Sequence, residues 1–212
     1  MVGTSQASHA AGRGPVRTAI KEPRQMTRAH AFAAEIKAEF PTFEIRYKRG
    51  DALQRAIHVA LMVLTVGGMR TYATRYHTVL FGKLWVPDAW DAMGDLDRVI
   101  LLRHERIHLR QRARMGDARM AVVYLLPFFP LFLAYGRARI EWEAYAETLR
   151  ATAELLGIEH ARALRPHIVG RFTGPDYGWM WPFPATVGRW FDAVIATLET
   201  EGVDAASVPP RD

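Results

Sequence analysis

Apolar residues in this chain recur mostly at intervals of three or four positions, the spacing that places them on one face of a helix. This pattern over residues 27–40, stopped by Pro41, predicts a first helix. A second helix is expected after Asp51, which forms a capping box with Gln54, and it should end at the glycine pair 67–68. Each of these helices has a residue type that explains where it begins or ends.

Stretches rich in β-branched and aromatic residues alternate with these helices. They predict strands over residues 43–47, 69–76 and 78–86. Towards the C-terminus, helical patterns return near residues 159–164 and 184–199, separated by a loop rich in Gly, Pro and aromatic residues. An order of helix, strands and then helices is typical of an α+β fold with a small mixed sheet.

The composition is consistent with one folded domain between two flexible terminal segments. A chain of 212 residues with 50% hydrophobic content can bury a core, and with no Cys it cannot use disulfides. Residues 1–24 are rich in small and basic residues and lack the apolar segment of a signal peptide. We expect a flexible basic arm over 1–24, a domain over 25–202, a flexible tail over 203–212, and a cytoplasmic location.

A helix predicted from Asp95 to Gly116 carries the sequence H-E-x-x-H, and an Asp in its first turn can cap it. Positions i and i+4 share a helix face, so His104 and His108 can hold one metal ion together. Glu105 lies beside them as a candidate general base. Without Cys, the ligands must be His and carboxylate, and neutral imidazole suits Zn²⁺. The helix therefore predicts a catalytic zinc site.

A third protein ligand must come from elsewhere in the chain. Metzincins place a glycine and then a histidine at fixed distances after the motif, where this chain has Gln111 and Arg114. That class is excluded. The other arrangement takes a Glu from a later helix, and the stretch 139–147 is helical in pattern and carries three glutamates. Glu141 is the preferred ligand, and Glu143 and Glu147 remain alternatives.

The sequence Glu141-Trp142-Glu143-Ala144-Tyr145 resembles the E-x-x-A-D signature of the HtpX-like and CAAX-prenyl-protease-like gluzincins. The strand and Pro-containing turn over 78–87 are similar to what precedes the motif helix in that family, so the resemblance spans about residues 76–150. It implies a zincin-like metallopeptidase whose third ligand is Glu141. Tyr145 stands where the family has a supporting Asp, so another group must orient the ligands, and the Tyr145 phenol is one candidate.

Further residues are expected to contact a peptide or protein substrate. In zinc peptidases an edge strand holds the substrate through main-chain hydrogen bonds, a role open to strand 78–86 if it is not an ordinary core strand. The aromatic loop 172–183 could line the cleft or simply cap a core. Tyr177 in that loop, or His167 before it, is a candidate hydrogen-bond donor to the tetrahedral oxyanion.

Residues 120–136 form an uncharged stretch of 17 residues between two arginines. As a helix it would reach about 25 Å, and Pro127 and Pro130 would break it. A full crossing would also place Glu141 on the opposite side of a bilayer from the two histidines. We therefore expect a buried hairpin connection or a shallow peripheral contact with a membrane.

The net charge of +6 is concentrated in residues 1–50, which hold nine Lys and Arg against four Glu. Four arginines also follow one side of the motif helix, namely Arg103, Arg106, Arg110 and Arg114. This stripe is either a solvated face paired with nearby carboxylates or the surface of a nucleic-acid or acidic-surface binding module, in which the motif is coincidental or a structural metal site. No recognised nucleic-acid motif accompanies it, so nucleic acid is the less expected partner.

Overall fold

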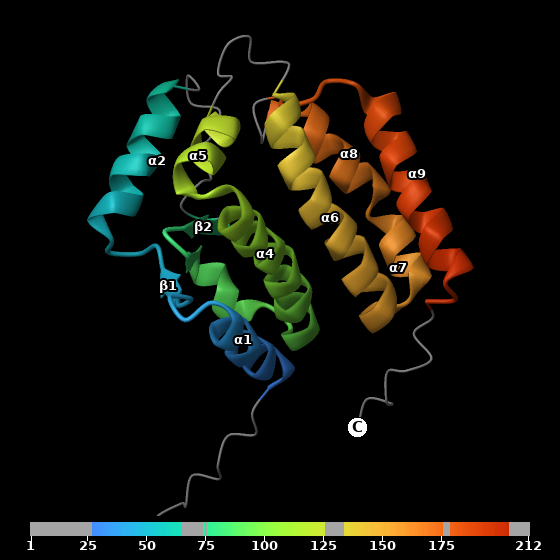
Figure 1. Cartoon of the computed structure of the whole chain (residues 1–212), viewed down its shortest axis with the longest axis horizontal. Helices are drawn as coiled ribbons and strands as arrows, with labels where there is room; N and C mark the ends of the chain where they lie inside the picture. Colours follow the sequence, from blue (N-terminus) through green and yellow to red (C-terminus); the bar gives the residue numbers. More distant parts are fainter. Residues whose placement is uncertain (1–26, 65–73, 75, 126–133, 176–178, 204–212) are drawn as a thin grey trace, which may run out of the picture.

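The computed structural model describes residues 27–64, 74, 76–125, 134–175 and 179–203. Helices dominate, and a small sheet lies among the first half of them (Figure 1). In chain order the elements are α1 (Arg28–Glu39), β1 (Ile45–Tyr47), α2 (Ala52–Leu64), β2 (Thr78–Leu80), β3 (Lys83–Val86), the 3₁₀ helix η1 (Asp88–Ala92), α4 (Asp95–Met115), α5 (Asp117–Leu125), α6 (Tyr135–Leu156), α7 (Ile158–Ala163), α8 (Arg165–Thr173) and α9 (Pro184–Thr200).

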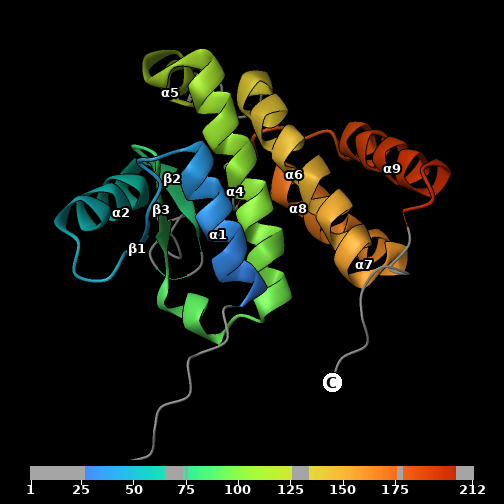
Figure 2. The same cartoon turned by 60° about the horizontal axis from the view of Figure 1, so that its bottom comes forward.

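The fold is α+β, as the order of elements predicts. The described strands form a three-stranded mixed sheet in the order β1-β3-β2, with β1 parallel and β2 antiparallel to β3. The sheet and α1 lie on one side of α4, whereas α6 to α9 lie on its other side (Figure 2). The pairing of α4 with α6 is the most extensive contact between elements of the described chain.

The single strand predicted over 78–86 is wrong, because the chain folds back within it. Leu80 pairs with Lys83, which leaves Phe81 and Gly82 as a two-residue turn between β2 and β3. Both have positive φ, 52° and 74°, as in the type I′ turns that suit the twist of a hairpin. Phe81 looks strand-like in the sequence but is 66% exposed at this turn. The hairpin makes β2 an edge strand of the described sheet.

The predicted helix signals are mostly confirmed. Thr27 caps α1, and Asp51 caps α2 by accepting a hydrogen bond from the Gln54 N–H at 2.8 Å. Asp95 differs from expectation, because α4 begins after Gly94 without a side-chain cap. Its carboxylate instead accepts the N–H groups of Arg28 and Ala29 and so caps α1 from another helix.

Other boundaries differ in extent. The Glu-bearing helix, predicted over 139–147, is the 22-residue helix α6, and α8 was not predicted. The predicted end of α2 at 67–68 lies outside the described residues. The strand predicted over 69–76 lies mostly outside them too, and the described Thr74 is helical.

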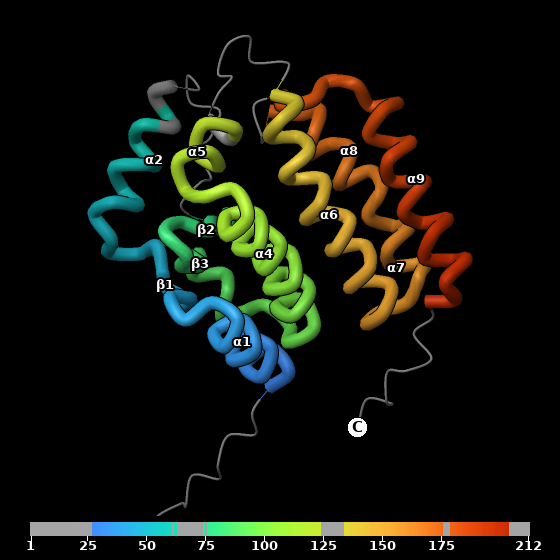
Figure 3. The backbone as a smooth tube through the Cα atoms, viewed as in Figure 1, coloured from blue at the N-terminus to red at the C-terminus, as the bar shows by residue number. Residues whose placement is uncertain are grey.

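Two apolar clusters hold the fold together. One is formed by α1, the sheet and α4 around residues such as Ile36, Leu84 and Leu102. The other is formed by α6 to α9 around aromatic residues such as Trp142 and Phe172. The tube in Figure 3 shows α4 and α6 running beside each other between the two groups of elements. The α4–α6 contact is therefore the seam between two cores.

No helix in the described part of the chain is both long and apolar enough to cross a membrane. Of the uncharged stretch 120–136, the part up to Leu125 belongs to α5, and residues 126–133 lie outside the described residues. The arm 1–24 and the tail beyond Val203 also lie outside them.

Candidate metal centre

Three side chains converge at the seam between α4 and α6. The Nε2 atoms of His104 and His108 are 3.2 Å apart, and the Nε2 of His108 is 3.9 Å from Oε2 of Glu141. All three possible ligand atoms lie within 4.8 Å of one another. Tetrahedral Zn²⁺ bonded at its usual lengths separates two ligands by about 3.3–3.5 Å. The His-His-Glu group therefore fits a single metal ion.

The hydrogen bonds of the other two candidate glutamates, Glu143 and Glu147, explain why Glu141 is the one that reaches this point. Glu143 accepts from Gln111 Nε2 at 2.9 Å and from Arg114 at 3.0 Å. Glu147 accepts from Arg103 Nε at 2.6 Å. Glu141 instead lies beside His108 and is only 2% exposed. Of the three candidates, Glu141 is the one that the fold brings to the histidines.

Burial sets the electrostatics of the centre. Glu105 is 5% exposed and His108 8% exposed. Burial raises the pKa of Glu105 to about 7, with His108 and Lys48 lowering it and Glu141 raising it. Burial also depresses the pKa of His104 far below its ordinary value, and the neighbouring His108 adds to this effect. His104 is therefore neutral at physiological pH, the form that binds metals.

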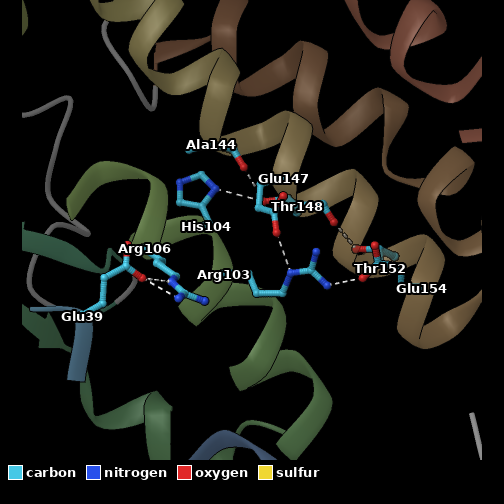
Figure 4. Close-up of polar contacts among 9 residues, drawn as sticks. All are labelled: Glu39, Arg103, His104, Arg106, Ala144, Glu147, Thr148, Thr152 and Glu154. Carbon is cyan, nitrogen blue, oxygen red and sulfur yellow. Dashed lines mark hydrogen bonds and ion pairs between the residues drawn. The ribbon is translucent and has the colours of Figure 1, made fainter. Parts of the chain in front are cut away.

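Each imidazole is held at its Nδ1 atom. His104 Nδ1 is 2.9 Å from the Thr148 hydroxyl, which itself donates to the Ala144 carbonyl at 3.1 Å (Figure 4). His108 Nδ1 is 2.9 Å from Oε1 of Gln111. Helical projection of the motif helix places Gln111 on the face of the histidines, but Thr148 is a contact that the sequence analysis missed. Its spacing of seven residues from Glu141, two helical turns, is the signal that could have found it.

Tyr145 contributes its ring to the surroundings of His104. The two rings meet edge to face with centroids 5.1 Å apart, and Tyr145 also contacts Phe172 at 5.5 Å. Thr148, almost one turn further along α6, supplies a polar contact at Nδ1 of the His104 ring. Tyr145 thus packs the ligand against the second core.

A buried cation lies beside Glu105 on the sheet side of α4. Lys48, directly after β1, is 4% exposed and donates from Nζ to the Thr78 hydroxyl at 3.0 Å. Burial lowers the pKa of Lys48 to about 7, an effect that the Glu105 carboxylate partly opposes. Burial, with a smaller effect of Lys48, lowers the pKa of His77 to about 4. Sequence reasoning missed both residues, because nothing in the pattern marks a lysine as buried.

The two candidate oxyanion donors remain predictions. Tyr177 lies outside the described residues. His167 is exposed on α8, where Arg171 Nε is 3.5 Å from its Nε2.

The arginines along the motif helix bond to carboxylates from other helices. Arg103 binds Glu147 and Glu154 of α6, as Figure 4 shows, and Arg114 binds Glu143. On the α1 side, Arg106 and Arg110 both bind Glu39. These ion pairs match the interpretation of the stripe as a face paired with nearby carboxylates.

Comparison with known proteins found no relative: no family model, no curated protein and no solved structure matches the chain. The identification of the His-His-Glu group therefore depends on the positions of these three residues.

Proposed function

We propose that this chain is a gluzincin-like zinc metallopeptidase, with His104, His108 and Glu141 as metal ligands and Glu105 as general base. The observation that carries the proposal is the meeting of three ligand atoms from two helices within 4.8 Å, next to a further buried carboxylate. Structural zinc sites normally use four protein ligands, whereas catalytic sites use three and keep a position open. The described residues supply three such ligands, the number that catalytic sites use.

The proposed reaction is the hydrolysis of a peptide bond. Zinc in such a site supplies a Lewis acid that makes water more acidic and polarises a carbonyl group. Glu105 accepts a proton from the attacking water and delivers it to the nitrogen of the leaving amine. A carboxyl group with a pKa near 7 is suited to both steps, because it exchanges protons readily at neutral pH.

The edge strand β2 supports a peptide as substrate. It pairs with β3 on one side and with no strand of the described sheet on the other. It also packs beside α4, and its Thr78 bonds to Lys48 near Glu105. An extended peptide added to this edge would run close to the general base.

A structural metal site is the second candidate, and the burial of His108 and Glu141 favours it. The two functions differ in what they require of Glu105. A structural site needs only the three ligands, whereas hydrolysis needs the carboxylate of Glu105 as well.

The test compares three variants with the wild type by metal analysis and by hydrolysis of fluorescently labelled casein and a quenched-fluorescent peptide library. Glu105→Gln should retain about one zinc per chain and lose hydrolysis, because the amide cannot accept the proton. His104→Ala should lose both zinc and hydrolysis. Glu147→Gln is the matched control, since Glu147 lies on the same helix as Glu141 but binds Arg103.

Hydrolysis that persists in pure Glu105→Gln protein overturns the proposed mechanism. Zinc at full occupancy without hydrolysis in the wild type, on any substrate tried, favours the structural site. Zinc-free wild-type protein that cannot be loaded contradicts both candidates.

A further inference from the structure

The orientation of Gln111 determines which nitrogen of His108 carries the proton. The Gln111 amide nitrogen donates to the Ile140 carbonyl at 2.9 Å and to the Glu143 carboxylate at 2.9 Å. Both of its hydrogens are thereby used on groups that can only accept. The amide oxygen must therefore face His108 Nδ1, so this nitrogen donates and His108 is the Nδ1–H tautomer.

Thr148 plays the corresponding part for His104, and it does so from the opposite helix (Figure 4). The single hydroxyl hydrogen of Thr148 goes to the Ala144 carbonyl, which leaves an oxygen lone pair for His104 Nδ1. With its hydrogen on Ala144, the Thr148 hydroxyl can only accept from His104, so this contact requires a proton on Nδ1.

In the neutral Nδ1–H form of each ring, the two Nε2 atoms carry lone pairs and lie 3.2 Å apart. Two lone pairs that face each other at this distance repel, unless a cation lies between them. Each histidine is therefore held with its metal-binding atom towards the same point, before any metal arrives.

We propose that Thr148 is a positioning residue of the metal centre, whose hydroxyl holds His104 as the Nδ1–H tautomer with Nε2 directed at the ion. This inference rests on the proposed metal site, and it assigns the supporting role that the resemblance places at position 145 to a residue almost one turn later on α6. Groups that orient a metal-bound histidine typically change metal affinity 10- to 100-fold when they are removed.

Thr152 provides a matched control on the same helix. It is buried, whereas Thr148 is partly buried, and like Thr148 it donates to the main-chain carbonyl four residues earlier, at 2.8 Å. In the described chain its hydroxyl bonds to that carbonyl alone, so it does not touch a ligand. A loss specific to position 148 therefore reports on His104 and not on the packing of α6.

The experiment measures the zinc affinity of Thr148→Val, Thr148→Ser and Thr152→Val by competition with a chelating dye. We expect about a 10- to 100-fold loss for Thr148→Val, near-complete rescue by Thr148→Ser, and no loss for Thr152→Val. Imidazole ¹⁵N NMR of the metal-free wild type should show His104 protonated at Nδ1. The same signal in Thr148→Val should shift towards a mixture of tautomers.

Equal zinc affinity in Thr148→Val and Thr152→Val overturns the proposal, as does an Nε2–H tautomer of His104 in the wild type. Should the wild type bind no zinc, the proposed function fails, whereas the NMR measurement still decides the role of Thr148. Should Thr148→Val not fold, the wild-type tautomer and the affinity of Thr148→Ser decide it.

Discussion

Lys48 is a buried charge beside the candidate metal centre, and its burial lowers the stability of the fold. The residue is 4% exposed, its ammonium group interacts electrostatically with Glu105 and His77, and the Thr78 hydroxyl accepts its hydrogen bond. Burial of a cation disfavours the charged form, so the pKa of Lys48 falls from 10.5 to about 7. A group whose pKa is lowered in this way binds fewer protons in the folded than in the unfolded chain.

The first prediction follows from the sign of this shift. Between pH 10.5 and 7 the unfolded chain holds more protons at Lys48, so stability is lost as the pH falls, and the cost is complete below pH 7. Lys48→Met should therefore raise the melting temperature of the metal-free protein, by on the order of 5 °C at pH 6. The gain should shrink as the pH rises towards 10.

Thermal unfolding with a chelator present, at pH 6 and pH 9, measures this difference. Lys37→Met is the control, because Lys37 is exposed on α1. A gain from Lys48→Met that is larger at pH 9 than at pH 6 would show that the ammonium group is not penalised by burial.

The residues of the candidate site differ in how far the sequence alone allows their positions to be predicted. His104, Glu105 and His108 are predictable, because their spacing within one helix suffices to place them together. Glu141 was preferred among three glutamates through a resemblance, and only the packing of α6 on α4 shows that it reaches the histidines. Lys48 depends on contacts between distant segments, so no local pattern reveals it. Thr148 follows Glu141 by two helical turns, but only the packing of α6 on α4 shows that it meets His104.

The β2–β3 hairpin is the element whose prediction failed, and its turn explains why. Type I′ turns usually carry Asn-Gly or Asp-Gly, whereas Phe81-Gly82 continues an apolar run. The longer helices were predicted better, since many residues contribute to a helical period and few to a short strand. The local sequence therefore only weakly indicates this turn, and distant residues such as Arg112 and Thr42 lie close to it in the fold.

The second prediction concerns Gly82 in this turn. A Cβ atom there would lie 2.8 Å from Arg112 Nη1 and 2.9 Å from Thr42 Oγ1, at a φ of 74°. Gly82→Ala should therefore destabilise the protein by about 2 kcal/mol, part from the backbone conformation and part from the displaced Arg112. Urea unfolding measures the loss.

Gly50 separates the two contributions. It has nearly the same φ, 77°, but a Cβ added there meets nothing within 4 Å. Gly50→Ala should cost only the conformational part, about 1 kcal/mol. Equal losses at Gly50 and Gly82 would show that the close approach of Arg112 and Thr42 has no energetic weight.

The third prediction concerns how α1 is anchored. Asp95 at the start of α4 accepts the N–H groups of Arg28 at 3.0 Å and of Ala29 at 3.1 Å. Asp95→Ala should cost about 1 kcal/mol, the usual value of an N-cap, and should loosen α1 more than α4. Hydrogen exchange should accelerate in the first turn of α1; unchanged exchange there would contradict the capping role.

The arrangement of the described elements places the three candidate metal ligands where two cores meet. α4 belongs to the core of α1 and the sheet, and α6 belongs to the core of α6 to α9. Buried polar side chains, including Gln111 and Glu141, lie at their contact. A metal ion held by both helices would therefore join the two cores through the polar part of this contact.

The last prediction is that zinc stabilises the molecule chiefly at this seam. Binding to the folded chain alone adds RT ln(1 + [Zn]/Kd), about 2.7 kcal/mol when free zinc is about 100-fold above Kd. Because His104 and His108 lie on α4 and Glu141 on α6, hydrogen exchange should slow in both helices on zinc addition. His104→Ala should show neither the higher melting temperature nor the slower exchange. Slower exchange in α4 without any change in α6 would mean that Glu141 does not bind the ion, and the third ligand would then have to be sought elsewhere.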